Sequence, residues 1–359
     1  VTQTFSNFEA AIGSNTNDSF IGDAAVANAF TGDTGNDTYD LSNSAAAVTV
    51  DLTAGRVSIG GVVDTISGIE TLIGVDGQAD IFYGNTSNAY GSSLVGGTGG
   101  SDLISYSKVN PGAGVTVALS AVGNGTATFG SYADTFTGME SLQGSLATKD
   151  AITANSNFKL DLSGAGSGTV SIGGSEAIAF SGFETFTGIA GNDTLVGNAV
   201  TAASLTAAGA GAVTIGGLGM AYTAFENVSL HGSSGSLTVT GGAVQLYGAE
   251  HLNAVSISAL GTVVAYADAT TGAINNAGNL VFAAGATTGN VTNASTGHLG
   301  FAAGATTGAA AAAFAARLAL AGNSTGGGAG TSATSGAAAG FAAGASGSAF
   351  SGSASAAAA

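Results

Sequence analysis

An internal repeat in the first two thirds of the chain constrains its fold more than any other feature. The clearest copy begins at Val48 and contains three runs of alternating apolar and polar residues, the last of which ends at Leu72. Partial copies begin at Val115 and Leu160, and a weak copy begins at Val213. Period-two runs bounded by Gly, Asn or Asp are typical of short β-strands with tight turns. A chain that repeats such a unit can grow by stacking each coil on a near copy of itself.

Composition agrees with a repeat protein and excludes several other classes. The 359 residues include 61 Gly but only one Pro and no Cys, which excludes collagen, a disulfide framework and Cys-ligated metal sites. Acidic residues outnumber Lys and Arg by 22 to 5, and the net charge of −17 leaves no basic surface for nucleic acid. The longest apolar stretch, residues 309–321, contains Arg317 and is too short to be a transmembrane segment.

We therefore predict an all-β fold, a right-handed parallel β-solenoid of the β-roll or β-helix kind. A sandwich or a barrel would also suit short strands, but sequence repetition favours the solenoid. Phe282 and Phe301 begin identical octapeptides 19 residues apart, a spacing that fits one small coil. The predicted segments are solenoid modules over 1–245, Ala/Gly/Thr-rich coils over 246–308, and an Ala/Gly/Ser-rich packing or assembly region over 309–359. For 309–321 a short helix is the alternative, because Ala, Leu and Arg are strong helix formers.

Many Asp residues share one local context, in which Asn, Ala or Ser precedes Asp and an apolar residue follows two places later. The clearest examples lie in residues 32–39 and 188–195. These turns resemble the RTX (repeats-in-toxin) nonapeptide Gly-Gly-x-Gly-x-Asp-x-apolar-x. The run from Val48 to Glu70 also resembles the module that connects calcium blocks in large secreted RTX proteins. The resemblance covers roughly residues 1–245 and implies Ca²⁺ held between loops of successive coils.

The resemblance implies a small number of degenerate calcium sites. Asp18 and Asp37 are 19 residues apart and form the best pair, whereas Asp80 and Asp102 are 22 apart and less regular. The candidate ligands for Ca²⁺, the expected cofactor, are Asp18, Asp23, Asp33, Asp37, Asp80, Asp102 and Asp193. The alternative is that these residues only form turns and bind no metal.

Glu recurs at matching places in the modules, at Glu70, Glu140 and Glu184. One interpretation is contact with a metal or with another subunit. The other is a coil corner at which Glu accepts backbone hydrogen bonds.

Catalysis finds little support in the sequence. His231, His251 and His298 lie in different repeats, and no His-Glu-x-x-His or Gly-x-Ser-x-Gly motif is present. We predict no enzymatic activity and no catalytic residues.

The favoured function is structural: a secreted protein on a bacterial cell surface, as an S-layer, adhesin shaft or filament subunit. Exposed strand edges would let it self-associate into a sheet or filament. The alternatives are an accessory region of a secreted RTX-like enzyme, or an adhesin module that binds ice or a surface glycan. The Thr pairs at 270–271, 287–288 and 306–307 could form the ladder that an ice-binding face needs.

Overall fold

The computed structural model describes residues 8–319 outside short gaps, together with 341–342 and 352–355. The gaps are 23–24, 85–91, 110–111, 113, 175–176, 232–234, 247–250, 267–269, 284–286, 289, 295, 302–305, 308 and 313–316. Every regular element of the described residues is a β-strand, so the predicted all-β fold is confirmed. The chain divides into two compact units: unit 1 holds residues 1–158 and 166–189, and unit 2 holds 159–165 and 190–359.

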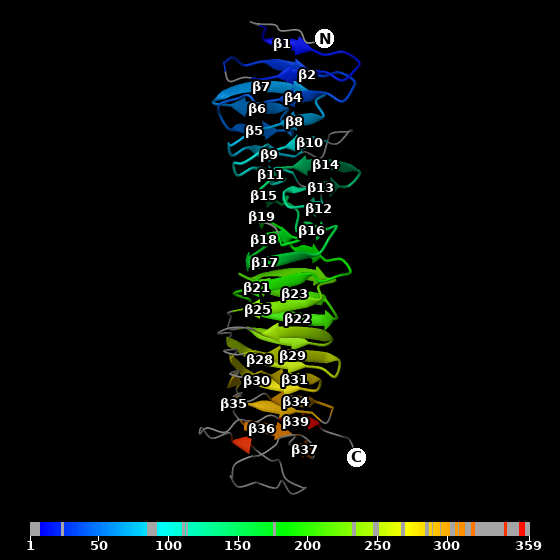
Figure 1. Cartoon of the computed structure of the whole chain (residues 1–359), viewed down its shortest axis with the longest axis vertical. Helices are drawn as coiled ribbons and strands as arrows, with labels where there is room; N and C mark the ends of the chain where they lie inside the picture. Colours follow the sequence, from blue (N-terminus) through cyan, green and yellow to red (C-terminus); the bar gives the residue numbers. More distant parts are fainter. Residues whose placement is uncertain are drawn as a thin grey trace. The chain divides into compact units, whose positions relative to one another are not determined.

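Unit 1 contains two sheets in which strands from successive coils pair in parallel (Figure 1). In pairing order, sheet 1A holds β1 (Ala10–Ile12), β3 (Ala29–Thr31), β7 (Val62–Ser67), β6 (Arg56–Ile59), β5 (Val48–Asp51), β9 (Ile81–Tyr83), β11 (Leu103–Ser105), β15 (Ser141–Gln143), β19 (Ile178–Ser181) and β18 (Ser167–Ile172). Sheet 1B holds β2 (Ser19–Ile21), β4 (Thr38–Asp40), β8 (Thr71–Ile73), β10 (Ser93–Val95), β14 (Tyr132–Thr137), β13 (Asn124–Phe129), β12 (Thr116–Ala121), β16 (Ala151–Ala154) and β20 (Thr185–Thr187).

Unit 2 is built in the same way. Sheet 2A holds β17 (Phe158–Gly164), β21 (Thr194–Asn198), β25 (Asn227–His231), β27 (Gly242–Leu246), β29 (Gly261–Ala265), β31 (Asn279–Phe282), β34 (His298–Phe301), β39 (Gly352–Ser355) and β37 (Arg317–Ala319). Sheet 2B holds β24 (Leu218–Thr223), β23 (Ala210–Ile215), β22 (Ala202–Ala207), β26 (Ser236–Val239), β28 (His251–Ile257), β30 (Thr270–Asn276), β32 (Thr287–Thr288), β33 (Val291–Asn293), β35 (Thr306–Thr307), β36 (Ala309–Ala312) and β38 (Phe341–Ala342). Parallel stacking of consecutive coils makes each unit a β-solenoid.

The repeated module does not form three sides of one coil. Its three runs form an antiparallel meander within one sheet: β5, β6 and β7 in sheet 1A, and β12, β13 and β14 in sheet 1B. The outer strands of the first meander continue the stack, because β7 pairs in parallel with β3 and β5 with β9. The hairpin between β6 and β7 turns at Gly60 and Gly61, whose φ angles of 56° and 91° suit a two-residue turn with both residues in positive φ.

The short helix considered for residues 309–321 is wrong for the residues that the structure describes there. Residues 309–312 form β36 and residues 317–319 form β37. Strand β36 pairs in parallel with β33, with Ala310 opposite Val291. Hydrogen bonding to the edge of an existing sheet therefore outweighs the helix propensity of Ala and Leu.

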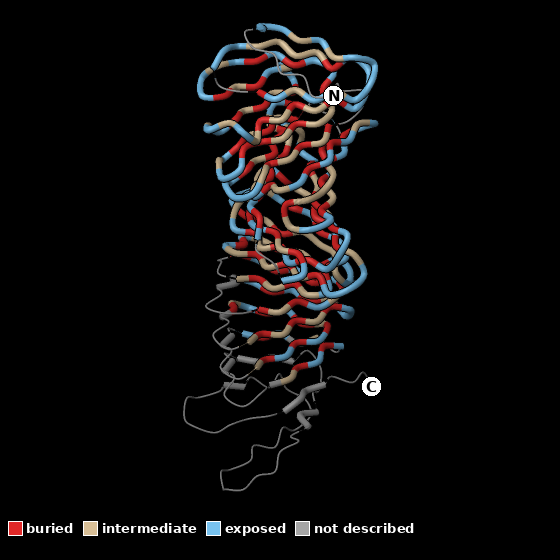
Figure 2. The backbone as a smooth tube through the Cα atoms, turned by 45° about the horizontal axis from the view of Figure 1, so that its top comes forward, coloured by how far each residue is buried: buried red, intermediate tan, exposed pale blue. Residues whose placement is uncertain are grey.

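The core lies between the two sheets of each unit, and buried positions alternate with exposed ones along the strands (Figure 2). Near the start of unit 1, three aromatic rings lie in a row, each tilted against the next by about 40°. The ring centroids of Phe20 and Phe30 are 5.2 Å apart, and those of Phe30 and Tyr39 are 5.0 Å apart. In unit 2, Phe282 is fully buried and pairs in register with Phe301, so the 19-residue spacing equals one coil at that point.

Candidate functional site

Fully buried aspartates are the most unusual feature of this core. Of the buried polar or charged side chains in the described residues, seven are Asp: Asp37, Asp64, Asp80, Asp102, Asp134, Asp150 and Asp193. A buried carboxylate is costly unless hydrogen bonds compensate for its lost hydration. The partners of these groups therefore show what the acids do.

Five of the seven stand directly before a strand: Asp37, Asp80, Asp102, Asp150 and Asp193 come just before β4, β9, β11, β16 and β21. Asp18 stands in the same place before β2, and Glu70, Glu140, Glu184 and Glu226 stand before β8, β15, β20 and β25. Parallel stacking therefore sets these acids above one another at the coil corners.

At each of these corners the backbone N–H of one acid donates to the carboxylate of the acid in the next coil. Asp80 donates to Oδ1 of Asp102 at 2.8 Å, and Asp102 donates to Oε2 of Glu140 at 2.7 Å. We call such a series a carboxylate ladder. The described residues contain four: Asp18–Asp37–Glu70, Asp80–Asp102–Glu140, Asp150–Glu184 and Asp193–Glu226. Each ladder ends on the Glu of a repeated module, so the coil-corner interpretation of these Glu residues is confirmed.

The first acid of a ladder also caps its own turn. Oδ2 of Asp80 accepts the N–H of Val75 at 2.6 Å, while its Oδ1 accepts the N–H of Val48 at 2.7 Å. In the same way, Oδ2 of Asp150 accepts the N–H of Ser145 and its Oδ1 accepts the N–H of Val115, both at 2.7 Å. Burial raises the pKa of Asp80, and the two N–H donors act against that rise.

The middle acids of the ladders differ, because one oxygen of each is unpaired. Oδ2 of Asp37 and Oδ2 of Asp102 are buried and have no hydrogen-bond partner in the described residues. Burial raises the pKa of Asp102 to about 7. The N–H of Asp80 opposes this rise, and the charges of Asp80 and Glu140 add to it.

Two further buried acids connect the meanders to neighbouring coils by hydrogen bonds. Asp64 in β7 accepts the Tyr39 hydroxyl and the N–H of Asn28, and Asp134 in β14 accepts the Tyr106 hydroxyl at 2.8 Å. The N–H of Ser92 also donates to Asp134, at 3.0 Å. Burial raises the pKa of Asp134 to about 6, although these hydrogen bonds lower it.

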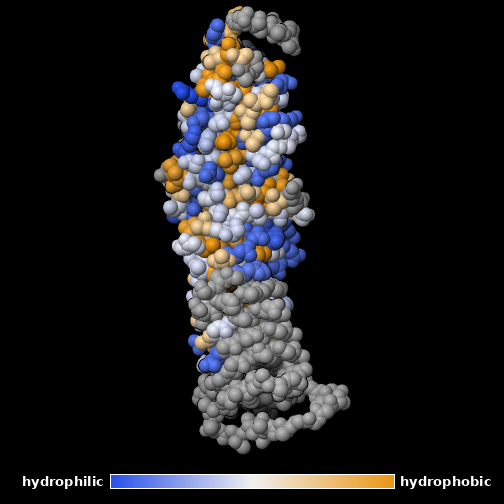
Figure 3. Space-filling view, turned by 90° about the vertical axis from the view of Figure 1, so that its left-hand side faces the viewer, coloured by the Kyte–Doolittle hydropathy of each residue, from blue (hydrophilic) through white to orange (hydrophobic). Residues whose placement is uncertain are grey.

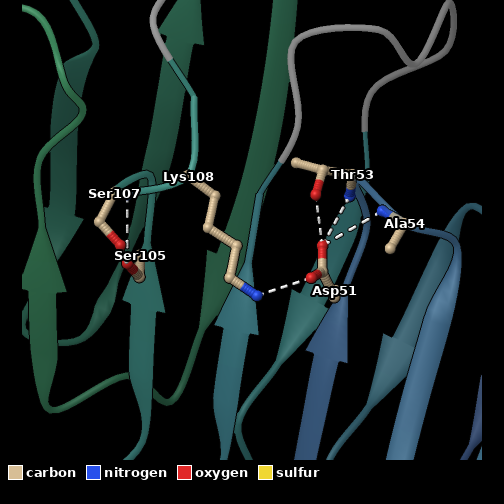
Figure 4. Close-up of polar contacts among 6 residues, drawn as sticks. All are labelled: Asp51, Thr53, Ala54, Ser105, Ser107 and Lys108. Atoms are coloured by element: carbon tan, nitrogen blue, oxygen red, sulfur yellow. Dashed lines mark hydrogen bonds and ion pairs between the residues drawn. The ribbon is translucent and has the colours of Figure 1, made fainter.

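One exposed contact also joins separate coils of unit 1 (Figure 4). Lys108, after β11, forms an ion pair of 2.6 Å with Asp51 at the end of β5. Its Nζ lies 3.7 Å from the ring centroid of Tyr83, on the intervening strand β9. Asp51 also accepts the N–H groups of Thr53 and Ala54 and the Thr53 hydroxyl, so it holds its own turn as well.

The structure brings together both predicted pairs, Asp18 with Asp37 and Asp80 with Asp102. The backbone N–H of Asp193 donates to the carboxylate of Glu226 and not to that of another Asp. Asp33 lies in an exposed turn at φ 76°, outside the ladders, and Asp23 lies outside the described residues.

Sequence reasoning did not select Asp150, Asp64 or Asp134. Asp150 carries the same signal as the others, an apolar residue two places later. Asp64 and Asp134 occupy matching positions in two copies of the module, and that repetition of a charged residue within a strand was the available signal.

The residues fit calcium poorly. Ca²⁺ takes about six to eight oxygen ligands, yet no group of three or more His, Cys, Asp or Glu residues able to hold a metal occurs in the described part of the chain. Oδ1 of Asp37 and of Asp102 accepts a backbone N–H, and Oδ2 of each accepts none. Calcium binding at the predicted Asp residues therefore stays a prediction, and no step below is derived through a metal.

His231 and His298 lie on different strands, β25 and β34. No described helix is long and apolar enough to cross a membrane. On the face shown in Figure 3, hydrophobic and hydrophilic residues of the described part lie interspersed. No family model matches the chain, and a search of curated proteins finds no relative.

Proposed function

We propose that this chain is a structural module of an extracellular bacterial surface protein, such as an S-layer, an adhesin shaft or a filament subunit. The observation that carries the proposal is the use of the buried acids. In the described residues they join coil to coil and cap turns, and they form no convergent reactive centre. The extracellular bacterial setting rests on the resemblance of the turns to RTX repeats.

Self-association would use the strand edge at the start of unit 1. Among the described strands, β1 pairs only with β3, and β2 pairs only with β4. Ile12 and Ile21 on these strands are 77% and 64% exposed. An unpaired edge that carries large apolar side chains is prone to pair with another chain. The occupant that we propose is a second copy of this chain.

Sedimentation velocity of the full chain over a range of concentrations tests this proposal. We expect concentration-dependent association that the double variant Ile12→Lys/Ile21→Lys reduces. Val63→Lys is the matched control, because Val63 is also exposed, at 41%, but lies on β7 inside a paired meander. A monomer at every concentration, or an equal effect of the control, would overturn self-association through this edge.

Binding of a neutral glycan is a second candidate function, favoured by a shallow groove of about 350 Å³ in unit 2. Four exposed side chains from successive strands line it in one column: Thr238, Ser256, Asn275 and Thr292. The lining contains no charged residue, which suits a ligand rich in hydroxyl groups and without charge. Titration with neutral β-linked oligosaccharides tests it: saturable binding that Asn275→Arg abolishes supports this function, and no binding refutes it.

The arrangement of the Thr pairs argues against the ice-binding alternative. Thr270, Thr287 and Thr306 stack in register, as do their neighbours Thr271, Thr288 and Thr307. Successive residues of a strand point to opposite faces, and Thr271 is buried. At position 270–271, therefore, the two threonines cannot both belong to one flat outer face.

A further inference from the structure

We infer that the carboxylate ladders take the place of bound Ca²⁺ in joining successive coils, so that this solenoid folds without a metal. The inference rests on the hydrogen bonds and contacts of the turns and does not depend on the proposed function. Three observations carry it: the donors that the carboxylates already hold, the closeness of neighbouring turns, and the different surroundings of the two oxygens in individual acids.

Each ladder fixes a backbone N–H of one coil to an acid of the next at 2.7 to 2.9 Å. A bond between a carboxylate and an N–H is charge-assisted and stronger than a neutral one. A Ca²⁺ ion that took the oxygens already accepting these N–H groups would leave buried N–H groups without acceptors, at a cost in stability.

Neighbouring turns also touch at Gly35 and Gly100, two residues before Asp37 and Asp102. A methyl group on Gly35 would lie 2.9 Å from the carbonyl carbon of Thr16, in the turn of the preceding coil. On Gly100 it would lie 1.8 Å from the carbonyl oxygen of Gln78. At these points of contact the turns leave no gap for an ion that needs oxygen ligands at about 2.3–2.6 Å.

The hydrogen bonds of single oxygens distinguish Asp80 from Asp102. Both oxygens of Asp80 accept N–H groups. Oδ2 of Asp102 accepts none, and it borders the same point as a carbonyl oxygen: a methyl group on Gly96 would lie 2.6 Å from this Oδ2 and 2.2 Å from the oxygen of Gly138. In an Asn side chain at position 80, the NH₂ group would therefore face one of these N–H donors and could not accept from it. At position 102, the NH₂ group would take the place of Oδ2 and could donate to the carbonyl oxygen of Gly138.

The first experiment uses the wild-type full chain. After treatment with EDTA we expect an unchanged far-UV β-sheet spectrum, and a thermal transition that 10 mM Ca²⁺ shifts by less than about 2 °C. Loss of the β-sheet spectrum in EDTA with recovery on adding Ca²⁺, or a saturable rise of the transition by about 10 °C or more, would overturn the inference.

The second experiment compares two variants that remove the same charge, Asp80→Asn and Asp102→Asn. The ladder predicts that Asp80→Asn lowers the transition by several degrees, whereas Asp102→Asn leaves it unchanged or raises it. A calcium site predicts instead that both variants weaken a response to Ca²⁺ by about tenfold or more. If Asp80→Asn fails to fold, the wild-type calcium titration and the Asp102→Asn comparison still decide the question.

These outcomes are separate from those of the proposed function. A chain that stays folded in EDTA but remains monomeric supports the ladder and refutes self-association. A chain that assembles only with Ca²⁺ and unfolds without it refutes the ladder and keeps the structural function.

Discussion

Asp102 lies one coil beyond Asp80 and accepts the backbone N–H of Asp80 on Oδ1 at 2.8 Å. The same relationship joins Asp18 to Asp37 at 2.7 Å, and in each case the second acid donates its own N–H to a Glu in the following coil. Acids spaced like calcium ligands thus act as backbone acceptors. The position of each acid directly before a strand makes this arrangement repeatable from coil to coil.

Asp102 should give the protein a distinctive dependence of stability on pH. Its pKa is about 7 in the folded state, against 3.8 without the surrounding structure. As the pH rises, the unfolded chain therefore releases this proton first. The stabilisation from a protonated Asp102 is full below pH 3.8 and is lost as the pH rises to about 7.

Asp102→Asn removes this titration and isolates its effect. Thermal unfolding between pH 4.5 and 8 should show that the variant gains stability relative to wild type as the pH rises, with a plateau above about pH 7. Parallel curves for the two proteins would show that Asp102 does not titrate in this range.

The Tyr106–Asp134 contact should contribute to the stability of unit 1. Tyr106→Phe leaves Oδ2 of Asp134 buried without its hydroxyl donor, and we expect a loss of about 1–3 kcal/mol in the free energy of unfolding. Tyr132→Phe is the control, because the Tyr132 ring stacks on Phe129 but its hydroxyl has no hydrogen bond in the described structure. Equal losses in urea denaturation would mean that the ring, and not the hydroxyl, stabilises the unit.

The hairpin at Gly60 and Gly61 should tolerate Asn but not Val. Asn adopts positive φ more readily than other non-glycine residues and is common in two-residue hairpins, so Gly60→Asn should change stability little. A Cβ added at Gly61 meets no atom within 4 Å, but Val there must hold a φ of 91°, at a cost of about 1–2 kcal/mol or more. Denaturant unfolding of the two variants checks this, and a stable Gly61→Val variant would contradict the turn geometry.

Lys108 should contribute a small stabilisation that depends on salt. Its ion pair with Asp51 is partly exposed, so Lys108→Met should cost less than about 1 kcal/mol, and the cost should shrink in 1 M NaCl. Lys159→Met provides a comparison, because Lys159 lies 3.6 Å from Asp161 and has no ring contact in the described structure. A large loss that persists in high salt would point to packing on Tyr83 as the main contribution.

The solenoid could be predicted from the repeats, but the meanders were missed. The signal for them was present, because Gly60–Gly61 and Gly216–Gly217 each separate two alternating runs as two-residue hairpins do. The helix considered for 309–321 failed because pairing with a neighbouring strand is a long-range effect that local propensity does not contain. The chemistry at the ladders could not be read from sequence, since Asp before an apolar strand suits both a metal turn and a turn that accepts backbone N–H groups.

Hydrogen exchange of individual backbone amides in calcium-free buffer tests the central claim most directly. The N–H groups of Asp37, Asp80 and Asp102 should exchange as slowly as those of the strands that follow them, because each is held by a carboxylate of the next coil. The amide of Asp33, in the exposed turn, provides the fast-exchanging reference. Exchange of the ladder amides as fast as that of Asp33, with protection only after Ca²⁺ is added, would contradict the account.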